Sequence, residues 1–245
     1  MKPNLFEHKF AKDLIQWLPV ARFDGEVIIV DELAKLPDSI DYLSCQKCIG
    51  VDTEARPSFV RGIRYQTALL QMATEERCYL FRLSAIGLPQ EIAAIFANAN
   101  ICKVGLAFKD DLNGLRRYYN FKPANCVDLQ SIAGKYGILD LGLQKMFAIC
   151  FGKKISKSQQ LTNWENAQLT PEQARYASTD AWATLLIYKE LMATEPLPPE
   201  EAAALRQAEL ERQYQHQQEM QAARQNTNEQ TTTHQCLITN NRPFY

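Results

Sequence analysis

Two carboxylates, Asp52 and Glu54, follow an apolar stretch at residues 48–51 that is typical of a buried strand. Successive side chains of a strand point to opposite faces, so Asp52 and Glu54 share one face while Thr53 points to the other. Two carboxylates on one face at a strand end can bind the same metal ion. The triplet alone has little specificity, because aspartate and glutamate together supply 28 of the 245 residues. Its meaning depends on the other acids of the chain.

Further acids stand at the ends of two other predicted elements. An apolar strand at residues 104–108 runs into Asp110 and Asp111 at the start of a helix. Tyr176 and Asp180 lie four residues apart in a predicted helix, so they occupy the same face of it. Several alanines beside them would let this helix approach a sheet closely. An isolated tyrosine would be expected to pack in the core, but an aspartate one turn later favours a functional site.

These acids predict a metal-dependent phosphodiester hydrolase. Asp52, Glu54, Asp111 and Asp180 would repel one another and have raised pKa values unless divalent cations neutralised them. Ligand sets made only of oxygen select hard ions such as Mg²⁺ or Mn²⁺. Two such ions roughly 3.5–4 Å apart can stabilise the attacking and the leaving oxygen of an in-line phosphoryl displacement.

The remaining pattern predicts an α/β fold with a mixed sheet and flanking helices. Three strands separated by short turns indicate an antiparallel meander, and a short apolar strand then alternates with helices. A capping box at Thr170 and Gln173, with proline between them, begins the last helix of the sheet domain. The expected strands are 27–30, 49–54, 67–74, 78–83, 101–106 and 126–127, and the expected helices are 33–43, 89–98, 111–119, 129–136, 141–150 and 170–192.

The chain is expected to hold one catalytic domain with appendages. Residues 1–24 form an N-terminal extension, and residues 25–195 form the catalytic α/β domain. Three prolines between residues 196 and 199 end this domain. A helix with few large apolar residues is expected at 196–225, and a polar, disordered tail at 226–245.

Composition favours a soluble, cytoplasmic protein that has no membrane partner. No apolar run approaches the roughly 18–20 residues of a membrane span, and the first residues lack a signal-peptide pattern. Seven cysteines spread through predicted elements fit reduced thiols. Cys45 and Cys48 have the spacing of half a zinc site, but no second pair completes it, so a structural role is favoured.

The net charge is −1, so contact with nucleic acid requires a local basic patch. Residues 141–164 contain no acid, and a second basic cluster, Arg56, Arg61 and Arg64, follows the Asp52 strand. A solvated surface is the alternative explanation for charge runs of this kind. The candidate substrate-binding residues are Thr53, Arg56, Lys145, Lys153, Lys154, Lys157 and Trp164, with the basic side chains contacting phosphates and the tryptophan stacking on a base.

The sequence resembles the DEDDy family of 3′–5′ exonucleases, which includes ribonuclease D, the proofreading domains of DNA polymerases and the exonuclease domain of the Werner syndrome protein. Tyrosine four residues before the last aspartate marks this branch, and the three histidines lie outside the domain. The resemblance covers about residues 25–192, so the domain at 25–195 is the expected exonuclease domain. The motifs are residues 51–54, residues 105–115 around Asp111, and residues 176–180, with further Werner-like matches at 78–81, 162–164 and 169–173.

The resemblance implies a ribonuclease H-like, DnaQ-like exonuclease fold and a two-metal site that uses two Mg²⁺ or Mn²⁺ ions. Asp52, Glu54 and Asp180 would hold the first metal, Asp52 would bridge to the second, and Asp111 would complete the coordination of the second through water. Tyr176 would orient the attacking water. These five residues are the predicted catalytic set.

Asp110 competes with Asp111 for the second motif. We assign the role to Asp111, which lies six residues after Gly105 and four before Leu115, and expect Asp110 to cap the helix. Asp128 also resembles a family position, but capping of the following helix is the preferred interpretation.

The predicted activity is removal of 5′-monophosphates from the 3′ end of a nucleic acid, with single-stranded or recessed DNA favoured and RNA possible. The alternatives are a ribonuclease D-like RNA trimming enzyme and a catalytically silent nucleic-acid-binding module of the same fold. No helicase or second nucleic-acid-binding domain fits in the rest of this sequence, so processivity would need a protein partner.

Overall fold

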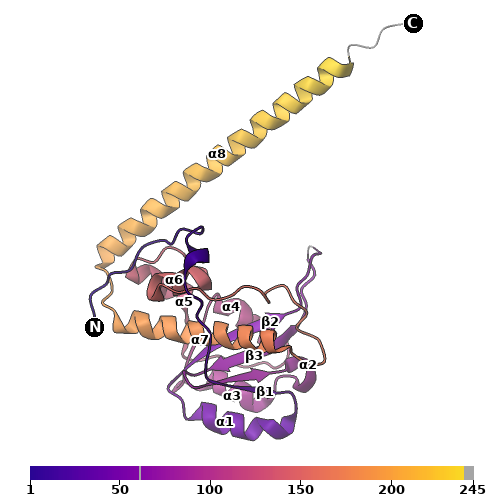
Figure 1. The fold of residues 1–245 in the computed structure, drawn as a ribbon, viewed down its shortest axis with the longest axis vertical. Coiled ribbons are helices and arrows are strands. Elements are labelled where there is room, and N and C mark those ends of the chain that lie inside the picture. The colour runs from indigo at the N-terminus through magenta and orange to yellow at the C-terminus, as the bar shows by residue number, and fades with distance from the viewer. Residues whose placement is uncertain (61, 240–245) are drawn as a thin grey trace. The chain divides into compact units, whose positions relative to one another are not determined.

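The computed structural model describes residues 1–60 and 62–239, with side chains described as far as residue 221. The chain divides into two units, residues 1–197 and residues 198–245. The first unit contains the sheet and the helices that cover it (Figure 1).

The described residues form a mixed six-stranded sheet with the strand order β1-β4-β3-β2-β5-β6. Strands β2, β3 and β4 pair in antiparallel fashion, which confirms the predicted meander, while β1, β5 and β6 join the sheet as parallel strands. The strands are β1 (Glu26–Val30), β2 (Cys48–Ala55), β3 (Thr67–Ala73), β4 (Arg77–Phe81), β5 (Cys102–Gly105) and β6 (Cys126–Asp128).

Helices cover both faces of the sheet, which confirms the expected α/β class (Figure 1). One face packs on α1 (Leu36–Ser44), α3 (Gln90–Ala97) and α4 (Phe108–Leu115). The other packs on α5 (Leu129–Ala133), α6 (Leu143–Phe151) and α7 (Pro171–Ala193). Every residue of β3 is buried, because this strand lies inside the sheet with a helix layer on each side.

Helix α7 begins with the capping box that the sequence predicts. The Thr170 hydroxyl accepts a hydrogen bond from the Gln173 amide, and the Gln173 side chain accepts one from the Thr170 amide. This helix lies very close to β2 at Gly50. A Cβ added to Gly50 would lie 2.0 Å from the carbonyl oxygen of Ala181, so glycine is required for this approach.

Several element boundaries differ from the sequence expectation. The helical segment expected at residues 33–43 begins with a 3₁₀ turn, η2 (Leu33–Lys35), and Asp31 before it forms an ion pair with Lys35. Additional short helical segments are η1 (Ile15–Trp17), α2 (Leu83–Ile86) and η3 (Gly134–Tyr136).

The second unit contains one long helix, α8 (Pro199–Thr239), which continues beyond the predicted helix end at residue 225. The segment after 225 is polar but contains no glycine or proline before residue 239, so nothing in it breaks a helix. The remainder of the predicted tail, 240–245, lies outside the described residues. Within the described chain, no helix is both long and apolar enough to span a membrane.

Candidate active site

Three of the predicted metal ligands meet between β2 and α7. Asp52 and Glu54 extend from the β2 face that α7 covers, and Asp180 extends from α7. One ligand oxygen from each of the three carboxylates lies within 4.8 Å of the other two. The close approach at Gly50 produces this convergence, because Gly50 and Asp52 share a strand face and Ala181 directly follows Asp180.

Asp111 reaches the same region from the opposite face of the sheet. It lies in the first turn of α4, and its Oδ1 accepts a hydrogen bond of 2.5 Å from the Thr53 hydroxyl. Thr53 therefore points away from Asp52 and Glu54, as the strand alternation predicts. Its hydroxyl orients an acid of the site, a role that the sequence interpretation as a substrate contact missed.

Asp128 fixes the start of the helix that carries Asp111. Its carboxylate accepts hydrogen bonds from the backbone amides of Ala107 (3.0 Å) and Phe108 (2.9 Å), and it also caps α5 through the amide of Gln130 (3.0 Å). The expected cap at α5 is confirmed, while the bond to α4 was not foreseen. The expectation that Asp110 caps α4 is wrong, because its side chain makes no capping bond and Asp128 takes the free amides.

Burial and mutual repulsion raise the pKa values of these carboxyl groups. The pKa of Asp52 rises to about 8 through burial and the charge of Asp180, and that of Glu54 to about 10 through burial and the charges of Asp52, Asp180 and Asp111. Burial and the charge of Asp52 raise the pKa of Asp111 to about 8, although the Thr53 hydrogen bond opposes this. An all-oxygen cluster with this excess of negative charge fits a hard divalent cation.

Tyr176 lies one turn before Asp180 and is bonded to it. The two side chains share a hydrogen bond, in which the phenol donates to the carboxylate. Burial raises the pKa of Asp180 to about 7, and this bond moderates the rise. Burial, then the charges of Asp180 and Glu54, raise the pKa of the phenol well above its ordinary value. The hydroxyl therefore stays protonated at neutral pH, which suits positioning and not general-base catalysis.

A cavity of about 330 Å³, the catalytic pocket, opens over these side chains. Lys157 is the one cation among its lining residues, and its charge opposes the rise that burial causes in the pKa of Asp180. Sequence reasoning identified Lys157 but missed the neutral lining, which comes from loops with no distinctive pattern. The lining residues are Asp52, Thr53, Glu54, Leu106, Gly142, Leu143, Gln144, Ile155, Ser156, Lys157, Gln160, Tyr176, Asp180 and Thr184.

Trp164 is not available for base stacking, contrary to the sequence expectation. Its side chain is fully buried, and its ring centroid lies 6.0 Å from that of Tyr176. The tryptophan therefore packs against Tyr176 inside the protein. A large aromatic residue near a motif looks the same in the sequence whether it supports the site or contacts the substrate.

The remaining predicted substrate contacts are dispersed. Lys145 forms an ion pair with Asp140 (2.8 Å), and Nη1 of Arg56 lies 3.7 Å from Oε2 of Glu165. Lys153 and Lys154 are adjacent in sequence but line two other cavities. Arg61 of the second basic cluster lies outside the described residues.

Comparison with known proteins identifies the family of this chain. The 3′–5′ exonuclease family matches residues 27–194. The bifunctional 3′–5′ exonuclease/ATP-dependent helicase WRN of Mus musculus is 31% identical over 184 residues, which is 71% of this chain and 13% of that protein. The chain therefore spans a small part of this relative's length.

Solved structures share the fold at low sequence identity. The Nibbler EXO domain of Aedes aegypti aligns with a TM-score of 0.64 at 24% identity, over 76% of this chain and 99% of that one. Ribonuclease D of Trypanosoma brucei, in complex with RNA U12, aligns with a TM-score of 0.63 at 18% identity, over 72% of this chain and 65% of that one. These structural similarities confirm the ribonuclease H-like fold, and the family match over residues 27–194 confirms the resemblance seen in the sequence. The chain belongs to the 3′–5′ exonuclease family, whose members are hydrolytic nucleases.

Proposed function

We propose that this chain is an active 3′–5′ exonuclease that uses Mg²⁺ or Mn²⁺, two ions per site, and releases 5′-monophosphates. The observation that carries the proposal is the convergence of Asp52, Glu54 and Asp180 within 4.8 Å, with Asp111 held by Thr53 close enough that the charge of Asp52 raises its pKa. A binding module would gain nothing from buried acids that repel one another. The complete acid set therefore argues against the catalytically silent alternative.

The carboxylates of Asp52, Glu54, Asp180 and Asp111 would hold the cations. Bound there, the ions would stabilise the attacking and leaving oxygens of an in-line displacement. Tyr176, which stays protonated, would orient the attacking water through its hydroxyl. Lys157, the cation of the catalytic pocket, is available to a substrate phosphate.

We favour DNA as the substrate, with a single-stranded or recessed 3′ end, because the Werner-like motifs and the match to WRN point to that branch. RNA trimming is the second candidate, and the structural similarity to a ribonuclease D that binds RNA supports it. In either case the 3′ end of the strand would enter the catalytic pocket. A protein partner would supply processivity.

The test is digestion of 5′-labelled single-stranded DNA, recessed duplex DNA and RNA in Mg²⁺, Mn²⁺ or EDTA. Wild-type protein should produce a metal-dependent ladder that shortens from the 3′ end, and Asp52→Ala should produce none. The substrate digested fastest identifies the branch. Lack of cleavage of every substrate would refute the proposal, and equal cleavage by Asp52→Ala would refute the site.

A further inference from the structure

A second cavity, of about 600 Å³, adjoins the catalytic pocket on the N-terminal side of α7. We call it the basic pocket because four cationic side chains and one carboxylate line it. It shares Gln144, Ile155, Ser156 and Tyr176 with the catalytic pocket, so the two cavities meet at the catalytic tyrosine. The charged lining residues are Lys12, Arg22, Lys154, Arg175 and Glu172.

Residues that precede the family match build one wall of the basic pocket. The match begins at residue 27, whereas Lys12, Arg22 and several of their neighbours line the cavity. This wall is fixed to the domain by backbone pairing. Val20 forms a parallel bridge with Lys154, and the amide of Ala21 donates to the Lys154 carbonyl (2.8 Å).

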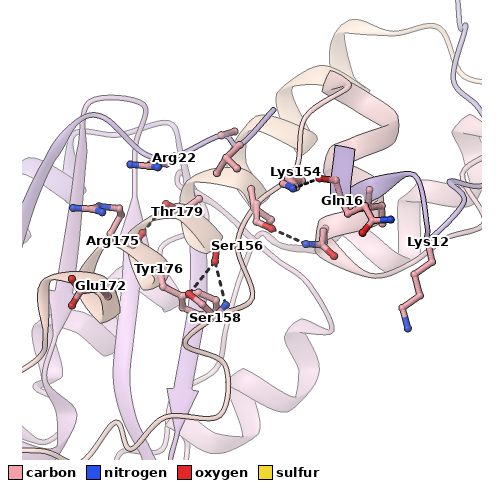
Figure 2. A pocket seen from close by; sticks show the side chains of 15 residues that line it. Lys12, Gln16, Arg22, Lys154, Ser156, Ser158, Glu172, Arg175, Tyr176 and Thr179 are labelled. Atoms are coloured by element: carbon pink, nitrogen blue, oxygen red, sulfur yellow. Dashed lines mark hydrogen bonds between the residues drawn. The ribbon is translucent and has the colours of Figure 1, made fainter. Parts of the chain in front are cut away.

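The same segment is also fixed to α7. The Phe23 amide donates to the hydroxyl of Thr179 (3.2 Å), and the Lys154 ammonium group donates to the carbonyl of Gln16. A hydroxyl of the catalytic helix and a cation of the pocket therefore hold the N-terminal segment in place. Backbone and side-chain hydrogen bonds thus hold the wall of the basic pocket in place within the first unit (Figure 2).

Two guanidinium groups of the basic pocket have no protein partner. Within the described residues, neither Arg22 nor Arg175 makes a side-chain hydrogen bond or an ion pair. Figure 2 shows both groups on the same side of the pocket, with Tyr176 and Ser158 in its middle. Unpaired guanidinium groups in a cavity that serine hydroxyls also line are suited to bind a phosphate, which accepts hydrogen bonds from both kinds of group.

We propose that the basic pocket binds a nucleotide phosphate and that Arg22 and Arg175 are its main contacts. The favoured source is an internal phosphate of the strand whose 3′ end occupies the catalytic pocket, an assignment that rests on the proposed function. A free mononucleotide, the expected product, offers the same chemistry. The N-terminal segment then contributes to substrate binding in addition to the family domain.

The test is the binding of fluorescent oligodeoxythymidylates of about two to eight nucleotides, measured in EDTA so that cleavage does not interfere. The variant is Arg22→Ala with Arg175→Ala. The control, Arg117→Ala with Lys122→Ala, removes the same charge from exposed positions outside both pockets. Thermal unfolding of each protein verifies that it is folded.

The double variant should bind the longer oligonucleotides about tenfold more weakly, as expected when two guanidinium groups no longer bind phosphate. The slope of log Kd against log salt should decrease by about 0.7 for each phosphate that the variant no longer neutralises. Wild type should bind more tightly once the strand is long enough to reach the basic pocket, and the double variant should lack this gain in affinity. The control should behave as wild type does.

Thymidine 5′-monophosphate distinguishes the two sources of phosphate. If a free mononucleotide is the occupant, it should bind wild type and not the double variant, while both proteins show the same dependence on strand length. Equal Kd values, salt slopes and mononucleotide binding in wild type and the double variant would overturn the proposal. Because these measurements need no cleavage, their outcome is independent of whether the nuclease proposal holds.

Discussion

Replacing Gly50 with alanine should push α7 away from the strand that carries Asp52. The added Cβ would lie 2.0 Å from the Ala181 carbonyl oxygen and 2.9 Å from the Cβ of Leu185, whereas ordinary contact begins at 3.4 Å. The nearest atom belongs to the backbone, so no side-chain rotation relieves the overlap. The helix or the strand must therefore move by about 1 Å, and Asp180 must move with Ala181.

The shift should impair both stability and catalysis. Overpacking of this kind costs about 1–3 kcal/mol, which for a domain of this size lowers Tm by about 2–12 °C. Misplacement of a catalytic group by about 1 Å reduces activity by about 100-fold. Activity measured well below Tm should therefore fall far more than the folded fraction does.

Differential scanning calorimetry and initial rates of 3′-end cleavage measure the two effects. Gly142→Ala is the matched control for stability, because a Cβ added there meets no atom within 4 Å and the backbone is extended. A Gly50→Ala protein with the Tm and the cleavage rate of wild type would refute the claim that this close approach positions the site.

Three further predictions concern the charges and contacts of the site. Because the folded-state pKa values of Asp52 and Asp111 are raised to about 8, the stability they contribute in metal-free protein is fully present below about pH 4 and is lost as pH rises through about 8. Asp52→Asn should therefore raise Tm relative to wild type at about pH 9 but not at about pH 4, and calorimetry in EDTA that shows a pH-independent difference would contradict this. Thr53→Val should lower kcat/KM by about 10–100-fold because Asp111 loses the hydroxyl that orients it, whereas Thr53→Ser should retain activity. Equal kcat/KM values for Thr53→Val and wild type would exclude this orienting role. Trp164→Phe should lower Tm by about 2–10 °C without changing the Kd for DNA, because the ring is buried and packs on Tyr176. Weaker DNA binding with an unchanged Tm would instead support a base-stacking role for Trp164.

The acid set was predictable because strand and helix periodicity place it. Asp52 and Glu54 share a face by the two-residue alternation, and Tyr176 and Asp180 share one by the helical turn. The capping box at Thr170 gave the start of α7, since its side-chain bonds are local. Local rules of this kind do not depend on the rest of the fold.

Tertiary relationships were not predictable from local rules. The carboxylate of Asp128 binds the start of α4 because β6 lies beside β5 in parallel register, with Asp128 opposite Gly105. Charge and residue type likewise did not show that Trp164 is buried or that Lys145 is paired with Asp140. Each of these facts depends on segments that are distant in sequence.

We propose that Asp52, Glu54 and Asp180 hold the cation on which phosphodiester cleavage depends. A Mn²⁺ titration that follows metal binding by electron paramagnetic resonance and 3′-end cleavage in the same samples tests it most directly. We expect cleavage by wild type to rise with metal occupancy, and we expect Asp180→Asn, shown to be folded by calorimetry, to lose both metal binding and cleavage. Cleavage that continues in EDTA, or that Asp180→Asn performs at the wild-type rate, would contradict it.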